Sequence, residues 1–269
     1  MLTNDERDRY ERQLLLEGFG EQGQARLGAA RVLVVGAGGL GSPVLNYLVA
    51  AGVGTIGLGD FDTVAASNLQ RQILHWTRDV GRTKVDSAAE KLAELNPTVT
   101  LVPHADKVTA ANVVETVRGY DVVVDAVDNL TARYLITDAC FFEGIPVVEG
   151  AVLSYDGLLM TILPGRSACY RCLYPEPPLD VVLPTTAELG ILGATAGVIG
   201  TLQALEVVKL LTGTGSVLAD RLVQFDGRTT TFREIPWPRQ STCPLCGDEP
   251  TVTHPVEYRL RRAGDEAPA

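Results

Sequence analysis

The chain has 269 residues, of which 46% are hydrophobic, and a formal net charge of −10 at pH 7. A soluble chain of this length and apolar content can bury a core as one large domain or as two small ones. The acidic balance argues against a nucleic-acid-binding protein, which needs a basic face, and against binding to anionic membrane surfaces.

The N-terminal residues 1–12 are polar and charged, which is not typical of a secretory signal. We find no apolar run that reaches the roughly 18 residues needed to span a bilayer. The sequence therefore predicts a cytoplasmic protein with no membrane partner.

Residues 3–27 have the pattern of an amphipathic helical arm, interrupted by Gly18, Gly20 and Gly23. Strands and helices then alternate. The predicted strands are Arg31–Val35, Thr55–Leu58, Thr98–Pro103, Asp121–Ala126 and Pro146–Glu149, and the predicted helices are Pro43–Ala51, Lys84–Leu95, Ala110–Val117 and Thr131–Glu143. This alternation predicts an α/β fold with a Rossmann-like, mostly parallel sheet and helices on both faces.

The pattern changes after Gly150. Strands are expected at Gly157–Leu163, Leu222–Phe225 and Thr229–Ile235, with a long apolar helix at Gly193–Leu211. We expect these strands to extend the sheet in an antiparallel manner. Residues 174–190 contain four prolines and little periodicity, which predicts a mobile surface loop.

A glycine-rich turn follows the first predicted strand and precedes the first helix of the alternating region. Its glycines are Gly36, Gly38, Gly39 and Gly41. Small residues let the backbone approach phosphate oxygens and let the helix pack on the strand, and a helix N-terminus favours anions. Asp60 ends the second strand, where an acid that binds a ribose is expected. The pattern predicts a nucleotide site.

Charged residues downstream indicate which nucleotide binds. Arg71 lies in the loop after the second strand and Lys84 opens the next helix, so both can neutralise the pyrophosphate that leaves when ATP is cleaved. Asp128 follows the fourth strand, where a carboxylate can hold Mg²⁺ against phosphate oxygens.

Each of these residues also has an ordinary interpretation. Lys84 can be a solvated helix residue, Arg71 a surface ion pair, and Asp128-Asn129 a helix cap. A dehydrogenase that uses NAD with the same glycine turn is the main alternative enzyme. Such a dehydrogenase does not need Arg71 or Lys84 near the phosphates. The joint placement of these two residues with Asp128 therefore favours ATP over NAD.

Segments 36–41, 60–72 and 125–129 together resemble the bacterial HesA/MoeB/ThiF family. The further matches are Arg9-Tyr10-Glu11-Arg12-Gln13, Asn96-Pro97, Cys169-Tyr170-Arg171-Cys172, Gly197-Val198-Ile199-Gly200 and Cys243-Pro244-Leu245-Cys246. The resemblance runs from about residue 9 to residue 247. Members of this family adenylate the C-terminal Gly-Gly carboxylate of small ubiquitin-like sulfur carrier proteins and are related to ubiquitin-activating enzymes.

The resemblance implies roles for individual residues. Asp128 would take Mg²⁺, and Arg12 would reach across a homodimer interface to the ATP of the partner. The implied ATP-binding residues are Gly36, Gly38, Gly39, Gly41, Asp60, Asp62, Ser67, Asn68, Arg71, Gln72, Lys84, Asp128 and Asn129. On this reading residues 1–260 form one adenylyltransferase domain. It comprises a helical arm (3–27), a nucleotide-binding part (28–150), and a carrier-binding and zinc part (151–250). A polar tail follows at 261–269.

Four of the five cysteines form two C-x-x-C pairs, Cys169/Cys172 and Cys243/Cys246. Four thiolates suit a tetrahedral Zn²⁺ site, and the long gap between the pairs predicts that it joins distant parts of the chain. The alternatives to a zinc site are a pair of redox dithiols or buried free cysteines. His254 is a further candidate ligand. Cys140 is expected in the core, and His75 and His104 are read as ordinary surface or core residues.

Some members of the family carry another cysteine, which bonds covalently to the carrier, in the loop before the long helix. Thr186 stands where we would align it. We therefore expect adenylation only, with sulfur delivered by a separate sulfurtransferase. Loop 174–190 is expected to cover the carrier tail, with a disordered connector as the alternative. The pathway stays open: molybdopterin, thiamine, tRNA thiolation, or a relative that adenylates a substrate other than a carrier. A zinc-stapled binding module is a further alternative.

Overall fold

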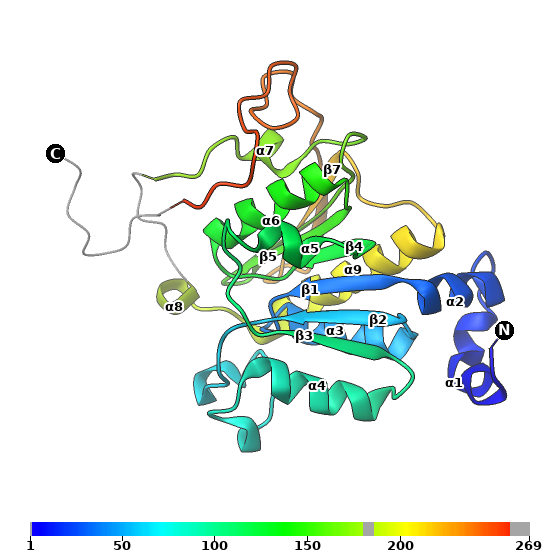
Figure 1. Cartoon of the computed structure of the whole chain (residues 1–269). Helices are drawn as coiled ribbons and strands as arrows, with labels where there is room; N and C mark the ends of the chain where they lie inside the picture. The colour runs from blue at the N-terminus through cyan, green and yellow to red at the C-terminus, as the bar shows by residue number, and fades with distance from the viewer. Residues whose placement is uncertain (1, 180–185, 259–269) are drawn as a thin grey trace.

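The central feature of the fold is a mixed β-sheet. A computed structural model describes residues 2–179 and 186–258, and these residues form an eight-stranded sheet (Figure 1). Its strands are β1 Arg31–Val35, β2 Thr55–Gly59, β3 Thr100–His104, β4 Val122–Asp125, β5 Val147–Leu153, β6 Asp156–Ile162, β7 Arg221–Asp226 and β8 Thr231–Pro236. Their order is β3-β2-β1-β4-β5-β6-β7-β8. Strands β1 to β5 pair in parallel, and β5 to β8 pair antiparallel, as predicted.

Helices cover both faces of the sheet. They are α1 Asn4–Leu14, α2 Gly20–Ala29, α3 Gly41–Ala51, α4 Lys84–Leu95, α5 Val113–Val117, α6 Leu130–Glu143, α7 Tyr170–Leu173, α8 Thr186–Leu189 and α9 Gly193–Thr212. Val32 and Val34 of β1 face the core shared with α2, α3, α4 and α9, whereas Leu33 and Val35 face the core shared with α5, α6 and α7. Because both faces are covered, the central parallel strands β1 and β4 are mostly apolar and buried, whereas the edge strand β3 is not.

The crevice for a ligand is set by the strand order. The chain leaves β1 toward β2 on one side, and β4 pairs with β1 on the other. In open α/β sheets, ligands bind at the carboxyl ends of the strands beside such a switch point. This places the predicted nucleotide site between the turn after β1, the loop after β2 and the segment after β4.

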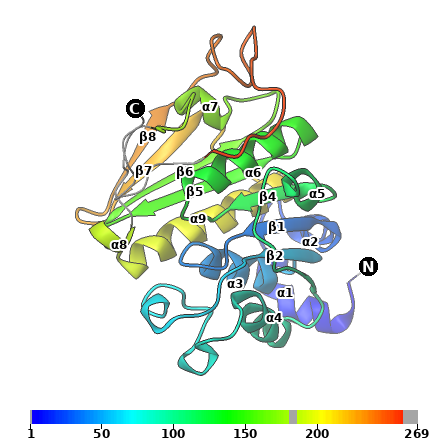
Figure 2. The same cartoon turned by 60° about the vertical axis from the view of Figure 1, so that its left-hand side comes forward.

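Helix α9 lies along the sheet beside α3 (Figure 2). It is long and apolar enough, by length and composition alone, to cross a membrane, so the statement that no apolar run reaches that length is wrong. Its apolar side chains have another explanation: Ile199 and Val207 are fully buried in the core. In addition, the side-chain amide of Gln203 donates to the carbonyl oxygens of Asp125 and Val148 in the sheet.

Several predicted boundaries are corrected by the structure. Helix α3 begins at Gly41, two residues before Pro43, and β5 continues to Leu153 because residues 150–153 pair with β6. The predicted loop 174–190 is helical at Thr186–Leu189. Its centre, residues 180–185, lies outside the described residues, as does the predicted tail at 261–269. The division into functional parts stays a prediction.

Candidate functional site

The glycine turn between β1 and α3 is fixed by two close approaches. Gly36 has φ +103°, and a Cβ atom there would lie 2.5 Å from the carbonyl oxygen of Ala126. A Cβ at Gly41 would lie 1.8 Å from the carbonyl oxygen of Gly36, so no residue larger than glycine fits at either position without a change in the turn. Gly38 and Gly39 differ, because a Cβ at either would meet only ordinary contacts at 3.4 Å. Their missing side chains keep the surface of the turn open.

Asp60 joins the end of β2 to this turn. Its Oδ2 accepts a hydrogen bond from the backbone N–H of Ala37 at 2.9 Å, and its Oδ1 accepts one from the N–H of Asp62 at 2.9 Å. The Asp60 side chain is 8% exposed. The structure therefore brings Asp60 to the glycine turn as predicted, although here its oxygens also hold the backbone in place.

Lys84 is buried at the start of α4, which the Thr83 hydroxyl caps by accepting from the Asp86 N–H. Its ammonium lies 2.9 Å from Asp62 Oδ2 and 3.5 Å from Asp60 Oδ2. The interpretation of Lys84 as a solvated helix residue is therefore wrong. A positive charge is held beside the turn, and two carboxylates compensate for its burial.

Arg71 lies against the glycine turn from the loop after β2. Its Cγ is 3.4 Å from the position that a Cβ of Gly39 would take, and its guanidinium donates to the Ser67 carbonyl at 3.2 Å. In residues 2–179 and 186–258 it makes no ion pair, so the reading as a surface ion pair is not supported. Asn68 shapes this loop, because its Oδ1 accepts from the Ala65 N–H.

Two further groups close the crevice. Gln72 is buried, its amide nitrogen lies 3.4 Å from where a Cβ of Gly38 would be, and its Oε1 has no hydrogen-bond partner. The start of α9 forms a wall: a Cβ at Gly193 would lie 2.4 Å from the Gln70 carbonyl oxygen, and Ala196 lies against Gly39. The sequence did not predict this role for α9.

Asp128 and Asn129 follow β4, next to the point where Ala126 touches Gly36. Asn129 caps α6, since its Oδ1 accepts from the Ala132 N–H at 2.8 Å. Asp128 takes no part in that cap, and its side chain is exposed. The helix-cap interpretation is therefore right for Asn129 and leaves the Asp128 carboxylate available to a cation.

A buried charge cluster ties the ends of β4 and β5 together, and the sequence analysis missed it. Arg133 Nη2 donates to the carbonyl oxygens of Val127 and Gly150, each at 3.0 Å, and Nη1 lies 2.6 Å from Glu149 Oε1. Asp125 Oδ2 lies 3.6 Å from Arg133 Nε. Burial raises the pKa of Glu149 to about 7 against the attraction of Arg133. The cluster fixes the segment that leads to Asp128.

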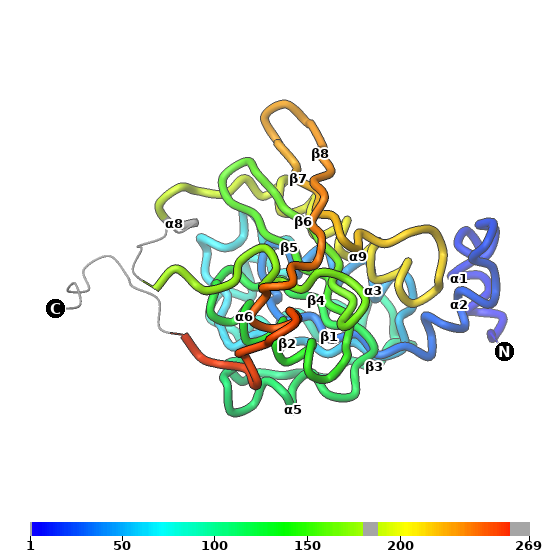
Figure 3. Tube along the Cα trace, turned by 90° about the horizontal axis from the view of Figure 1, so that it is seen from above, coloured from blue at the N-terminus to red at the C-terminus, as the bar shows by residue number. Residues whose placement is uncertain are grey.

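Arg12 is not brought to this crevice. It lies in α1 with its side chain 85% exposed, and α1 packs at the far end of α3 from the glycine turn, where Gln13 donates to the Ala51 carbonyl. Figure 3 shows α1 and α2 at one end of the molecule, away from α8. Within one chain, Arg12 therefore does not reach the turn.

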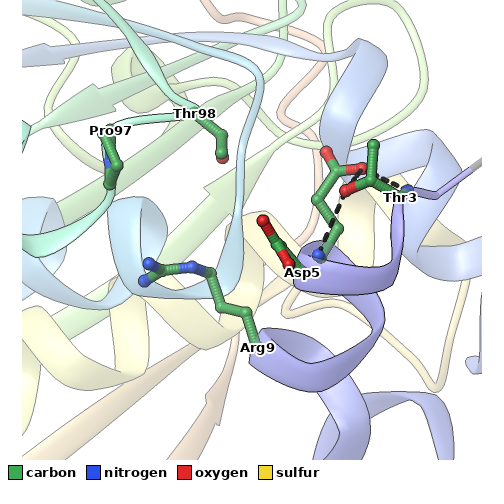
Figure 4. Close-up of a pocket in the computed structure, with 6 residues that line it drawn as sticks. Thr3, Asp5, Arg9, Pro97 and Thr98 are labelled. Carbon is green, nitrogen blue, oxygen red and sulfur yellow. Dashed lines mark hydrogen bonds between the residues drawn. The ribbon is translucent and has the colours of Figure 1, made fainter.

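A cavity of about 580 Å³ lies beside α1 and is lined by Thr3, Asp5, Glu6, Arg9, Pro97 and Thr98 (Figure 4). Thr3 and Glu6 form a capping box, and Arg9 donates to the Leu95 carbonyl. These polar groups stabilise helix ends, and none of the predicted site residues lies there. The cavity is thus separate from the predicted nucleotide site.

The four paired cysteines meet at one point. Their Sγ atoms all lie within 4.8 Å of one another, with Cys169 3.9 Å from Cys172 and 3.4 Å from Cys243. A zinc tetrahedron with bonds of about 2.3 Å has edges of about 3.8 Å, so the cluster fits Zn²⁺. The hydrogen bond between the thiols of Cys169 and Cys172 lowers the pKa of Cys172 and raises that of Cys169, and burial raises the pKa of Cys246, so a metal would displace protons from this cluster on binding.

The remaining histidines and Cys140 do not belong to the cysteine cluster. Cys140 is buried in α6, and burial raises the pKa of its thiol, as expected for a core residue. His104 bonds to the Tyr120 hydroxyl, and His254 to Thr253. His75 is buried, in agreement with the expectation of a surface or core residue, and its ring contacts the Ala37 carbonyl in the glycine turn.

Comparison with known proteins identifies the class. The model of the ThiF family matches residues 10–245, and this chain belongs to that family. A curated relative from Thermus thermophilus, named sulfur carrier protein adenylyltransferase, is 45% identical over 95% of this chain and 96% of its own length. The bovine adenylyltransferase and sulfurtransferase MOCS3 is 48% identical over 96% of this chain, which spans only 57% of that protein.

Solved structures share the fold. The crystal structure of E. coli MccB with MccA-N7isoASN has a TM-score of 0.81 to this chain at 21% identity and covers 91% of this chain and 76% of its own. At this identity the likeness concerns the fold, which agrees with the predicted mixed sheet.

Loss of either cysteine pair should remove zinc. We expect the purified protein to hold about one zinc ion per chain, and Cys172→Ser or Cys243→Ser to hold little and to unfold at a lower temperature, because metal binding is coupled to folding. Elemental analysis with thermal unfolding measures both. Cys140→Ala is the matched control and should keep its zinc. Full zinc content in Cys172→Ser would contradict the assignment.

Proposed function

We propose that this protein uses ATP to adenylate the C-terminal glycine carboxylate of a small ubiquitin-like sulfur carrier protein. The observation that carries the proposal is the pair of cations at the glycine turn: Arg71 lies against Gly39, and Lys84 contacts Asp60, whose carboxylate accepts from the Ala37 N–H. Membership of the ThiF family and the name of the Thermus relative, which matches nearly end to end, support the substrate.

The chemistry requires positioning and charge neutralisation. A terminal carboxylate is ionised at neutral pH, since its pKa is about 3.3–3.7, so no protein base is needed. Its oxygen forms a bond to the α-phosphorus of ATP, and the bond from that phosphorus to the bridging oxygen breaks, which releases pyrophosphate. In the proposal Arg71 and Lys84 stabilise the charge that builds on the pyrophosphate, and the turn after β1 binds phosphate oxygens.

The remaining assignments are part of the same proposal. Asp60 binds the ribose, with Asp62, Ser67, Asn68 and Gln72 lining the nucleotide. Asp128, an exposed carboxylate in the segment after β4, suits a Mg²⁺ ion, and a bound Mg²⁺ ion would neutralise phosphate charge. Asn129 supports Asp128 by capping α6.

Two features support a homodimer and a separate sulfur source. Arg12 is exposed and far from the crevice of its own chain, which fits a role at the site of a partner subunit. Four cysteines converge in one cluster and Cys140 is buried, so no thiol outside the cluster is accessible for sulfur transfer, and Cys246 within it is only partly exposed. We propose a separate sulfurtransferase, and a cytoplasmic location for the reaction.

Arg71→Ala should lower adenylation by roughly 10³-fold or more, the scale expected when an arginine that clamps a phosphoryl transition state is lost. The measurement is carrier-dependent exchange of labelled pyrophosphate into ATP. Arg78→Ala, in the same connection before α4 but paired with Glu90, is the control and should exchange at the wild-type rate. An Arg71→Ala rate within a few-fold of wild type would contradict the role of Arg71.

Mixing two inactive variants tests the role of Arg12. We expect Arg12→Ala and Asp128→Asn each to be inactive alone. In a symmetric dimer, random mixing places one intact site in half of the molecules and should restore about a quarter of the wild-type activity. Unchanged inactivity after subunit exchange, checked by native mass spectrometry, would rule out a shared site.

The distribution of the cysteines predicts that no covalent bond forms between enzyme and carrier. Intact mass spectrometry after incubation with ATP and the carrier should show the adenylated carrier and the unmodified enzyme. The same reaction without ATP is the control. An enzyme–carrier adduct that a thiol reductant releases would contradict this prediction, because it would show that a thioester or disulfide forms between the two proteins.

A further inference from the structure

His75 connects the glycine turn to α4. The side chain is 3% exposed and lies in the connection between the Ala66–Asn68 turn and α4. Its Nε2 is 2.9 Å from the carbonyl oxygen of Ala37, and its Nδ1 is 2.9 Å from the hydroxyl oxygen of Ser87. Both ring nitrogens are therefore engaged, one of them by the backbone that forms the proposed phosphate site.

The partners of His75 define its tautomer. The Ala37 carbonyl can only accept, so Nε2 must carry the hydrogen. On the other side, the Lys91 ammonium donates to Ser87 Oγ at 2.9 Å and to Asp79 Oδ2 at 2.6 Å. Because Lys91 is a donor only, the Ser87 hydroxyl keeps its own hydrogen, which can point to Nδ1 or to the Asp79 carboxylate. The Ala37 carbonyl thus selects the neutral imidazole with hydrogen on Nε2, and the Ser87 hydroxyl is compatible with it.

The contact with His75 orients one peptide group. A trans peptide directs its carbonyl and its N–H to opposite sides. His75 holds the carbonyl of Ala37 inward, so the N–H of Gly38 in the same peptide points outward. In residues 2–179 and 186–258 the N–H of Gly38 donates to no other group. Asp60 fixes the preceding peptide through the Ala37 N–H.

We propose that His75 is a positioning residue for ATP: as a neutral imidazole it orients the Gly38 N–H toward a phosphate oxygen. The inference rests on the proposed function for the identity of the ligand. His75 does not touch the nucleotide in this proposal and acts through the backbone of Ala37 and Gly38.

Protonation of His75 would keep the Nε2–H donor to Ala37 and add a second hydrogen on Nδ1, so that Ser87 Oγ would accept from both Nδ1 and Lys91. Burial lowers the pKa of His75; Lys91 and Lys84 lower it further, whereas the Ala37 carbonyl and Asp60 raise it. Asp79, whose pKa the Lys91 ammonium holds at about 2 despite burial, keeps that ammonium in place. With a lowered folded pKa, stability is full above about pH 6.5 and is lost as the pH falls through the folded value.

Two substitutions separate the two ring nitrogens. His75→Gln can place its amide N–H near the position of Nε2 and keep the bond to Ala37, whereas His75→Asn is too short and can replace only Nδ1. We expect the dissociation constant for the ATP analogue AMPCPP with Mg²⁺ to rise about tenfold in His75→Asn and less than about threefold in His75→Gln, the scale of one buried hydrogen bond. Calorimetry measures it. The control is His104→Gln, which changes a different, partly buried histidine and should bind AMPCPP with the wild-type dissociation constant.

The tautomer gives a readout that a purely structural role would not change. Nitrogen-15 spectra of the imidazoles should show hydrogen on Nε2 of His75 at neutral pH. Ser87→Ala keeps the imidazole but removes one of the two contacts that hold the ring, and should weaken binding about threefold because the ring is held less firmly against the Ala37 carbonyl.

The outcomes distinguish the inference from the proposed function. If wild type fails to bind AMPCPP, the proposed function fails. If wild type binds but folded His75→Asn and Ser87→Ala bind equally well, or if the spectra show hydrogen on Nδ1, only the role of His75 is overturned. An equal loss of binding in His104→Gln would also overturn it, because the effect would not be specific to the turn. Should His75→Asn not fold, Ser87→Ala and the spectra of wild type decide.

Discussion

The contact between the Asp60 carboxylate and the Ala37 N–H organises the site, because it joins three segments that are separate in the sequence. It links the turn after β1 to the end of β2, and the same carboxylate lies beside the Lys84 ammonium at the start of α4. A negative charge is thus needed to keep a buried positive charge in the crevice. An anionic ligand could take over part of this compensation, which is consistent with the proposed phosphate site.

Buried polar groups support the site from both sides of β1. On one side, a chain of hydrogen bonds runs from Ala37 through His75 and Ser87 to Lys91. On the other side, Arg133 holds the ends of β4 and β5. The Arg133 cluster is only partly satisfied, because Asp125 Oδ2 and both carboxylate oxygens of Glu149 have no hydrogen-bond partner among the described residues. The two bonds from Arg133 to the Val127 and Gly150 carbonyls are therefore what restricts the segment before Asp128. Catalysis that depends on positioning needs this rigidity.

The sequence predicts features that are locally encoded. The bounds of β1 and α4 are confirmed, since an apolar run defines the first, and Thr83 at the start and Asn96-Pro97 at the end define the second. The four cysteines were predicted to meet because their spacing is itself a local signal repeated twice. The extension of β5 and the wall formed by Gly193 and Ala196 depend on partners far along the chain, and no local pattern signals them. The role of His75 depends likewise on a contact with a carbonyl 38 residues earlier in the sequence.

The packing of α9 against the turn has a consequence for synthesis of the protein. Gly193 fits against the Gln70 carbonyl, Ala196 against Gly39, and Gly200 against the Leu40 carbonyl. All three contacts come from the last third of the chain, whereas the turn that they border is among the first segments to leave the ribosome. A nascent chain that ends before residue 193 has the glycine turn but lacks one side of the crevice. The capacity to retain a nucleotide should therefore appear late in translation, once α9 has emerged and folded back across strands made long before it.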